Sequence, residues 1–324
     1  MIKKNLLIIG GAGYIGSVLL EKISSYNVTI FDKFLFNSVK DYKKKFCKAK
    51  IIQGDINFGL SKYHFKNIDV VIHLAGLAND PSSDYNPNNT VLTNHISTIK
   101  IAKFCKLMKV KRLIYASSCS VYGDHGKKLV NEKDELRPLT VYALSKFSSE
   151  NEILKMNDKY FNVICLRFAT LFGYSPRMRF DLGVNLMAKK IICNKNIIIN
   201  GDGKQYRSFV HVKDVAKTLT FIADLKNNLK NNIYNVGSNK NNIKIIDLAK
   251  KLKKLFPEIK VVFEKDNKDF RSYRVDFLRL KKVININKFL SIEDGVMEVF
   301  SKFKDRNSKD LEDKKYYNLK TLKS

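Results

Sequence analysis

Residues 6–16 read LLIIGGAGYIG, a short apolar run followed at once by glycines spaced G-x-x-G-x-x-G. The apolar run predicts a buried strand, and residues 14–24 have the periodicity of a helix. A glycine loop between a strand and a helix lets the backbone approach a pyrophosphate and aims the helix N-terminus at it. The stretch therefore predicts a dinucleotide site at the first turn of an α/β fold. The residues expected to form it are Gly10, Gly13, Tyr14, Ile15 and Gly16.

Short apolar runs alternate with helical segments through the first half of the chain. The strands expected from these runs are residues 6–9, 28–31, 50–53, 70–74, 112–117 and 163–167. Helices are expected at residues 14–24, 90–108 and 141–156. Alternation of this kind is typical of βαβ units, so we predict a doubly wound parallel sheet, the Rossmann architecture.

The rhythm changes after about residue 173. Expected helices there are residues 184–193, 213–224, 245–255 and 291–303, and expected strands are residues 197–199, 233–236 and 261–263. We predict a Rossmann domain over residues 1–173 and a smaller α/β substrate-binding lobe over 174–304, which could lend elements back to the first sheet. The tail, residues 305–324, is either frayed or docked through Tyr316 and Tyr317.

Acidic residues follow the second and third expected strands. Asp32 ends the second strand, where its carboxylate would accept hydrogen bonds from ribose hydroxyls and repel a 2′-phosphate. This favours NAD over NADP, although the adjacent Lys33 softens the preference. Asp55 and Ile56 follow the third strand, where a carboxylate could reach the adenine amino group. Taken alone, Asp55 also suits a turn or a helix cap.

The chain of 324 residues has a formal charge of +29, carried by 60 Lys and Arg against 31 Asp and Glu. Only 10 of these cations are Arg, and the Lys are spread along the whole chain, whereas phosphate-reading surfaces favour clustered Arg. We therefore expect no specific nucleic-acid partner, although non-specific binding of polyanions at low salt is expected.

Cysteine spacing and hydropathy bound the setting. The five Cys form no C-x-x-C pair, which indicates neither a zinc site nor a disulfide framework, so no metal is expected. No run approaches the ~18 apolar residues that span a bilayer. The apolar start resembles a signal peptide, but its glycine spacing is better explained by a strand entering a loop. A cytoplasmic protein that contacts no membrane is expected.

Tyr142 and Lys146 stand four residues apart in an expected helix, so both lie on one face. A nearby ammonium lowers the pKa of a phenol, which predicts a usable base near neutral pH. Such a pair is often only a surface contact. Together with the glycine loop and the upstream Ser118, however, it indicates a redox enzyme.

The ordered motifs resemble the extended short-chain dehydrogenase/reductase family, in its NAD-dependent epimerase/dehydratase branch. The segments that carry the resemblance are residues 10–16, Asp32, 54–56, 73–76, 117–123 and Tyr142 with Lys146. Segments 167–173, 201–216 and 234–237 resemble the nucleotide-sugar enzymes of that branch. The resemblance covers about residues 5–300.

The resemblance implies a role for each matching residue. Tyr142 would be the acid/base, Lys146 would hold the nicotinamide ribose, and Ser118 would hydrogen-bond a substrate hydroxyl. The remaining implied cofactor residues are Leu74, Ala75, Gly76 and Asn94. The remaining implied substrate residues are Thr170, Asn185, Arg207 and Arg271, of which the two Arg would grip the nucleotide diphosphate. The resemblance also implies a homodimer that pairs the helices at 90–108 and 141–156.

Residues 119 and 120 bear on the reaction. Sugar 4,6-dehydratases of this branch carry an Asp-Glu pair there, and decarboxylases keep the Glu, whereas this chain has Cys119 and Ser120. Enzymes resembling GDP-fucose synthase use a cysteine acid near this point, and the spacing to Tyr122 gives that role to Ser120. With no carboxylate for elimination, the resemblance favours nucleotide-sugar epimerisation through a 4-keto intermediate, similar to UDP-glucose 4-epimerase.

Other functions stay open from the sequence. Thr170 replaces an asparagine of many UDP-galactose epimerases, so the base and the sugar of the substrate are undecided. A nucleotide 4-ketosugar reductase, which would consume reduced cofactor, and a 4,6-dehydratase are the enzymatic alternatives. An NAD-binding regulator or polyanion-binding scaffold on the same fold is the non-enzymatic one.

Overall fold

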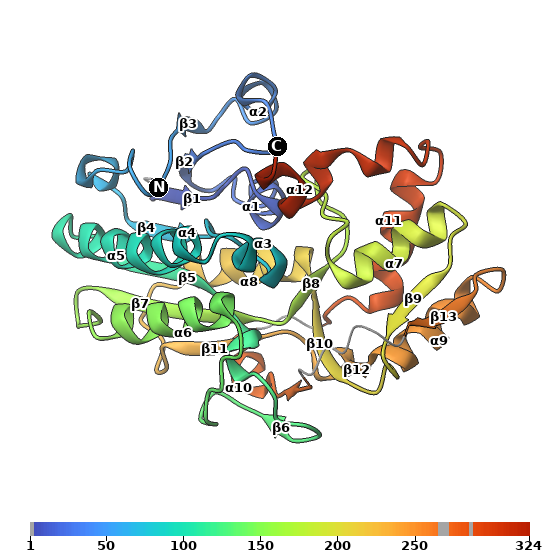
Figure 1. Ribbon diagram of the computed structural model, residues 1–324. Coiled ribbons are helices and arrows are strands. Elements are labelled where there is room, and N and C mark those ends of the chain that lie inside the picture. Colours follow the sequence, from blue (N-terminus) through green and yellow to red (C-terminus); the bar gives the residue numbers. More distant parts are fainter. Residues whose placement is uncertain (1–2, 265–271, 285–287) are drawn as a thin grey trace.

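The computed structural model describes residues 3–264, 272–284 and 288–324. A seven-stranded parallel sheet in the order β11-β7-β5-β4-β1-β2-β3 forms its larger part, with helices on both faces (Figure 1). The strands are β1 (Asn5–Ile9), β2 (Asn27–Asp32), β3 (Lys50–Gln53), β4 (Val70–His73), β5 (Arg112–Ser118), β7 (Asn162–Phe168) and β11 (Ile233–Val236). The predicted doubly wound α/β fold is confirmed.

The strand order locates the site. Successive strands run outward from β1 toward β3 on one side and from β4 toward β11 on the other, so the order reverses between β1 and β4. Ligands of open α/β sheets bind at such a switch point, beyond the carboxyl ends of the strands. The glycine loop follows β1, Asp32 ends β2, and Ser118 ends β5, so all three lie at this edge.

Among the described residues, the helices that flank this sheet are α1 (Tyr14–Leu19), α2 (Val39–Lys45), α3 (Asp80–Tyr85), α4 (Pro87–Val91), α5 (Ser97–Leu107), α6 (Val141–Leu154) and α8 (Val212–Asp224). The helix expected at residues 90–108 is built from α4, a π-helical turn at Leu92–Ile96, and α5. The helix expected at 14–24 is shorter than predicted. It ends at Leu19, and the chain then turns so that Ile23 and Tyr26 reach the core.

The second part of the molecule is built mainly on two small sheets. Strands β8 (Thr170–Phe172), β10 (Tyr206–His211) and β12 (Asn242–Lys244) form one, and β9 (Ile197–Asn200) pairs with β13 (Val261–Glu264). Helices α7 (Gly183–Ile192), α9 (Ile245–Leu255) and α11 (Ile292–Phe303) cover them. A further small sheet pairs β6 (Leu129–Val130) with β14 (Arg274–Val275). Strand β6 and the short α10 (Leu278–Lys281) lie below the large sheet in Figure 1.

Two elements after residue 174, the strand β11 and the helix α8, belong to the first part of the molecule. Strand β11 pairs with β7, and α8 packs against α1 and β5. The chain therefore passes from the first part to the second, returns, and passes across again. We propose that residues 174–304 form a lobe interleaved with the Rossmann domain rather than a lobe joined by one linker.

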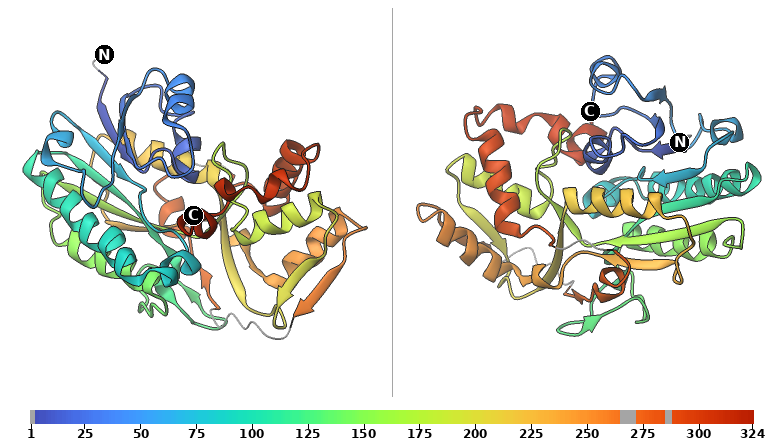
Figure 2. Two further views of the ribbon diagram at one scale, coloured as in Figure 1. Left: turned by 45° about the horizontal axis from the view of Figure 1, so that its top comes forward. Right: turned by 180° about the vertical axis from the view of Figure 1, so that it is seen from behind.

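The tail, residues 305–324, is docked, which decides between the two expected alternatives. Leu311 is buried, and the Tyr316 ring meets the Phe180 ring edge-on at 5.3 Å between centroids. The tail ends in the short helix α12 (Asn318–Leu322), which contacts α3. Figure 2 shows this end of the chain lying between the two parts of the molecule.

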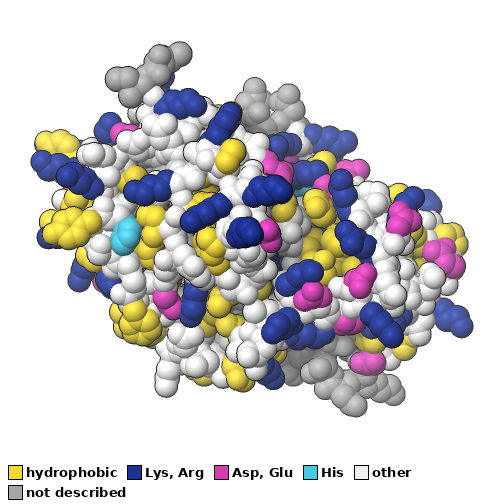
Figure 3. Space-filling view, turned by 90° about the horizontal axis from the view of Figure 1, so that it is seen from above, with side chains coloured by type: hydrophobic (Ala, Val, Ile, Leu, Met, Phe, Trp, Pro, Cys, Tyr) yellow, Lys and Arg dark blue, Asp and Glu magenta, His cyan; other side chains and the backbone are white. Residues whose placement is uncertain are grey.

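Surface charge is dispersed on the face seen from above. Lys and Arg side chains are separated there by apolar and uncharged ones rather than gathered into one patch (Figure 3). Within the described residues, no helix is both long enough and apolar enough to cross a membrane. The same residues contain no group of three or more His, Cys, Asp and Glu placed to hold a metal ion.

Candidate active site

Each of the three motif glycines has a different structural role. A Cβ at Gly10, where φ is +86°, would lie 2.5 Å from the Ala75 nitrogen, so the tight turn requires glycine. A Cβ at Gly16 would lie 2.3 Å from the Gly11 oxygen, so close packing of α1 requires glycine there. Gly13 is less crowded and lines a cavity. Gly13 is thus the position where a pyrophosphate could approach the backbone.

The cavity beside this loop has a volume of about 170 Å³. Among its lining residues are Gly10, Gly13, Asp32, Asp55, Ile56, Leu74, Ala75 and Gly76, all expected from the sequence. The loop after β2, with Phe34 and Phe36, also lines it, and so does Leu322 of the tail. Nothing in the sequence motifs indicated these apolar walls.

Backbone amides hold the Asp32 carboxylate. Its two oxygens accept hydrogen bonds from the N–H groups of Ala12, at 2.9 Å, and Phe34, at 2.7 Å. Burial raises the pKa of Asp32, and these hydrogen bonds oppose the effect. These hydrogen bonds fix the carboxylate at the end of β2, next to the glycine loop. A ribose bound in this cavity would lie beside it.

Asp55 differs from Asp32 because it is more exposed and paired. Its carboxylate lies 2.9 Å from the Lys33 ammonium and accepts a hydrogen bond from the Asn57 N–H. Burial acts to raise the pKa of Asp55, but Asn57 and Lys33 outweigh it and hold the pKa below its usual value. Lys33 is therefore occupied by Asp55 in this structure.

A second cavity of about 760 Å³ adjoins the first, with Leu74 lining both. The expected residues that line it are Ile15, Ser118, Ser120, Tyr142, Lys146, Thr170 and Arg207. They come from α1, the end of β5, the 3-10 turn that follows it at Cys119–Tyr122, α6, β8 and β10. Thr140 caps α6 by accepting the Ala143 N–H at 3.1 Å, which sets the helix that carries the Tyr142 and Lys146 pair.

Burial, rather than the Lys146 charge, dominates the acidity of Tyr142. The Lys146 ammonium donates to the Ala116 oxygen at 2.8 Å and lies 6.0 Å from the Tyr142 ring centroid. Burial raises the pKa of Tyr142 to about 12, and a hydrogen bond with Ser118 gives the largest opposing effect. Burial also lowers the pKa of Lys146 to about 8. The prediction that Lys146 brings Tyr142 near neutrality is wrong for the protein alone.

Ser120 faces the cavity and Cys119 does not. The Ser120 Oγ is buried and has no hydrogen-bond partner within the described part of the chain. The Cys119 thiol donates instead to the Arg167 oxygen at 3.2 Å, and burial raises its pKa. Of these two neighbours, only the serine is available to a ligand.

Two asparagines implied by the resemblance do not line either cavity. Asn94 accepts from the Leu77 N–H at 2.8 Å and donates to the Leu77 oxygen, so it fixes the loop after β4. Asn185 accepts from the Gly173 N–H at 2.9 Å and donates to the Tyr14 hydroxyl at 3.1 Å. Tyr14 in turn donates to the Gly173 oxygen. These three side chains hydrogen-bond to the segments that form the cavity walls and hold those segments in place.

Arg207 and Thr170 lie in the wall of the larger cavity. Arg207 is nearly buried, donates to the Tyr206 oxygen at 2.9 Å, and has its guanidinium 5.5 Å from the Tyr273 ring centroid. A guanidinium at a cavity wall suits a phosphate ligand. Arg271 lies outside the described residues.

Sequence reasoning missed a polar cluster in the cavity that Tyr142 lines. Arg179 makes two 3.0 Å hydrogen bonds to the Asp181 carboxylate, to which Asn79 also donates at 3.0 Å. Asp80 accepts from the Thr140 hydroxyl at 2.6 Å. All except Thr140 line the larger cavity. The charge of Asp80 raises the pKa of Tyr142 and that of Arg179 lowers it, so both lie within electrostatic reach of the phenol.

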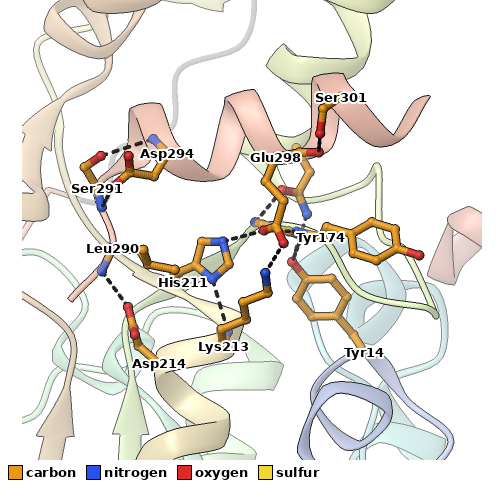
Figure 4. A network of polar contacts seen from close by, with 12 residues as sticks. Tyr14, Tyr174, His211, Lys213, Asp214, Leu290, Ser291, Asp294, Glu298 and Ser301 are labelled. Atoms are coloured by element: carbon orange, nitrogen blue, oxygen red, sulfur yellow. Dashed lines mark hydrogen bonds and ion pairs between the residues drawn. The ribbon is translucent and has the colours of Figure 1, made fainter. Parts of the chain in front are cut away.

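A second polar cluster ties the lobe to α1 (Figure 4). His211 Nε2 donates to the Glu298 carboxylate at 2.9 Å, and its Nδ1 accepts the Lys213 N–H at 3.1 Å. The Lys213 ammonium also forms an ion pair with Glu298, and the Tyr174 N–H donates a hydrogen bond to the Glu298 carboxylate. Burial acts to raise the pKa of Glu298, but His211 and Lys213 outweigh it and lower the pKa to about 2.

The fold and the site are those of a Rossmann-type NAD-dependent enzyme, with a cavity at the glycine loop that adjoins a second cavity lined by a tyrosine and a buried lysine. Residues 6–237 match the family model of the NAD dependent epimerase/dehydratase family, and the chain belongs to this family. The cavities fit the cofactor, since Gly13 and the fixed Asp32 carboxylate line the same space.

Known proteins resemble the chain over most of its length. A putative UDP-glucose 4-epimerase of Methanocaldococcus jannaschii is 32% identical over 243 residues, which are 72% of this chain and 77% of the relative. The UDP-N-acetylglucosamine 4-epimerase of Methanobrevibacter ruminantium superposes with a TM-score of 0.82 at 25% identity, covering 94% of this chain and all of that one. The UDP-glucuronic acid 4-epimerase of Bacillus cereus, with UDP-glucuronic acid and NAD, gives 0.80 at 26%, covering 95% and 99%.

Proposed function

We propose that the protein is a nucleotide-sugar 4-epimerase that oxidises C4 of a hexose to a ketone and reduces it again from the opposite face. One observation carries the proposal: Tyr142, Ser118, Ser120 and Lys146 line one large cavity that adjoins the cavity proposed for the dinucleotide. The resemblance to UDP-sugar 4-epimerases over nearly the whole chain supports the same substrate class.

Tyr142 would remove the proton of the C4 hydroxyl and return it after the ketone has been reduced. When bound, NAD supplies a hydride acceptor and a positively charged ring. A cation near the phenol lowers its pKa, and the hydrogen bond with Ser118 acts in the same direction. Burial holds the pKa of Tyr142 at about 12 in the protein alone, so the bound cofactor would have to lower it for Tyr142 to act as the base.

The neighbouring residues would orient the two ligands. The Lys146 ammonium, held at the Ala116 oxygen, would bind the nicotinamide ribose, and Ser118 would hydrogen-bond the reacting hydroxyl. Ser120 offers its unpartnered hydroxyl to the sugar. Arg207 would bind the nucleotide diphosphate from the β10 side of the cavity, and Thr170 would contact the sugar. Asp32 would accept the adenosine ribose hydroxyls.

The residues at 119 and 120 argue against a 4,6-dehydratase. Elimination of water needs an acid and a base at adjoining carbons. Cys119 is turned toward Arg167, and Ser120 is no carboxylate. A 4-ketosugar reductase uses the same tyrosine and is the second candidate, since its chemistry is half of the epimerase cycle.

A turnover assay with UDP-, GDP- and dTDP-hexoses tests the proposal. Expected is conversion of one sugar nucleotide to its C4 epimer, followed by NMR of the anomeric proton, with no net change in reduced nicotinamide. Stoichiometric consumption of added NADH with a 4-keto sugar would assign the reductase instead. A 4-keto-6-deoxy product would assign the dehydratase.

A further inference from the structure

The tail reaches the cofactor cavity, although it is the segment furthest along the chain from the glycine loop. Leu322 of α12 lines that cavity together with Phe36 and Leu77. Helix α12 contacts α3, and Figure 1 shows it at the edge where the strands end. An apolar side chain at this wall would cover part of the adenosine half of a bound dinucleotide.

Buried polar groups fasten α12 to both parts of the molecule. The Asn318 N–H donates to Asp181 at 3.2 Å, and the Asn318 Oδ1 accepts from Arg177 at 2.5 Å. The Arg177 guanidinium stacks on the Phe36 ring at 3.6 Å. Asn318 and Arg177 are 8% and 3% exposed, respectively. Asn318 therefore joins the loop after β2 to the carboxylate that orients Arg179 in the larger cavity.

A second anchor lies nearer the start of the tail. Lys189 of α7 is nearly buried and contacts both Glu312 and the Tyr317 hydroxyl. Tyr317 also donates to the Leu311 oxygen at 2.9 Å, which closes the tail on itself. The tail is thus held at two places, by Lys189 at residues 312 and 317 and by Asn318 at the start of α12. The rest of α12 follows these contacts, and its Leu322 lines the cofactor cavity.

We propose that residues 311–324 form a strap that retains NAD, with Leu322 as a cofactor-contacting residue and Asn318 as its positioning residue. The inference rests on the proposed function, because an epimerase returns to the same hydride carrier in every cycle and gains nothing from releasing it. A strap that spans the cofactor wall and the Asp181 to Arg179 pair slows escape of the cofactor while the sugar is still a ketone.

Exchange of bound NAD tests the strap without any sugar. Protein saturated with isotopically labelled NAD is mixed with excess unlabelled NAD, and the label that stays bound is measured over time. Leu322→Ala and Asn318→Ala are each expected to speed exchange about tenfold, the loss expected when a leucine contact is truncated or its support removed. The matched control is Leu255→Ala, at the exposed end of α9, which should exchange at the rate of the unaltered protein.

Limited trypsin digestion of the unaltered protein gives a measurement that needs no variant. Saturating NAD should slow cleavage after Lys320, in α12, at least threefold, and should leave cleavage after Lys254, in α9, unchanged. Equal exchange rates in both variants, or equal cleavage after Lys320 with and without NAD, would overturn the strap. Because neither experiment contains a sugar, faster exchange in a protein that epimerises no hexose would retain the strap and refute only the proposed function.

Discussion

The electrostatics at Tyr142 are set by a buried phenol among charges of both signs. Burial raises its pKa to about 12, Asp80 adds to the rise, and Ser118 and Arg179 oppose it. A base poised in this way is weak until a positive charge arrives beside it. In the proposed mechanism, this arrangement would link proton removal to the presence of oxidised cofactor.

Replacing Tyr142 with phenylalanine removes the proposed acid/base and leaves the ring. We expect kcat/KM for the best sugar nucleotide to fall about 10²–10⁴-fold, the usual contribution of a positioned acid/base. The exposed Tyr160→Phe is the control and should keep full activity. Activity of Tyr142→Phe within twofold of the unaltered enzyme would refute the assigned role.

Asp80 offers a test of the charges around the phenol. Its negative charge raises the pKa of Tyr142, so Asp80→Asn lowers that pKa. Because the deprotonated tyrosine is the proposed base, the rising limb of the kcat/KM profile against pH should move to lower pH. Asp84→Asn, at an exposed position of α3, should leave the profile in place. An unmoved limb in Asp80→Asn would show that another group sets it.

Local spacing explains which site residues could be read from the sequence. The glycine loop, Asp32, Ser118, Tyr142 and Lys146 each follow from a short motif within one element, and the structure brings them to one edge of the sheet. Asp80 begins α3, and Arg179 lies in the loop between β8 and α7. They reach the same cavity only because these two segments, which are far apart in the sequence, meet there. Such long-range meetings leave no local pattern.

Helix α11 is held against β10 and α8 by Glu298 and its partners. The Gly173 backbone, at φ +100°, lies so close to His211 that a Cβ there would be 2.2 Å from its Nε2. The Gly173 carbonyl oxygen also accepts a hydrogen bond from the Tyr14 hydroxyl of α1. One cluster of polar contacts therefore links α11, the end of β8 and α1. These polar contacts fix the second part of the molecule to α1.

Removing the Glu298 charge should destabilise this junction. We expect Glu298→Gln to lower the free energy of unfolding by roughly 1.5–3 kcal/mol at pH 7, the range for hydrogen bonds to charged groups. The folded-state pKa of about 2 lies below the usual value, so the stabilisation is complete above about pH 4.5 and is lost as the pH falls toward 2. Urea unfolding at pH 7 and pH 3 measures both values.

The difference between the two proteins should therefore shrink at pH 3. Glu258→Gln, an exposed substitution after α9, is the control and should unfold like the unaltered chain at both pH values. A difference that stays constant from pH 7 to pH 3 would mean that the charge of Glu298 is not what stabilises the junction.

Apolar periodicity explains which elements could be predicted. Strands such as β1 and β5 are buried runs on both faces of the sheet and were found, as were α7, α8, α9 and α11. Strands β8, β10 and β12 were not, because they are short and carry polar residues such as Arg207 and Ser208 that face the site or neighbouring strands. Their pairing depends on partners far along the chain.

At the scale of the whole molecule, the expected homodimer stays a proposal that the surface supports. Helices α4 to α6 and the π-helical turn expose large apolar side chains at Val91, Ile96, Leu107 and Leu144, with Ile96 and Leu144 each 52% exposed. Exposed apolar clusters on adjoining helices suit contact with a second copy.

Charges placed on this surface should separate the copies. We expect the unaltered protein to sediment as a dimer and the double variant Ile96→Glu with Leu144→Glu as a monomer at the same concentration. Leu255→Glu adds a charge elsewhere and should remain dimeric. A monomeric unaltered protein would refute the proposed pairing.

The return of β11 and α8 to the first sheet limits how the protein can be recombined with its relatives. Swapping everything after residue 173 for another enzyme's sequence would replace the edge strand beside β7 and the helix against α1, and so graft foreign packing into the Rossmann core. Hybrids that exchange sugar preference should instead transplant two blocks, before α8 and after β11, and leave residues 212–236 native.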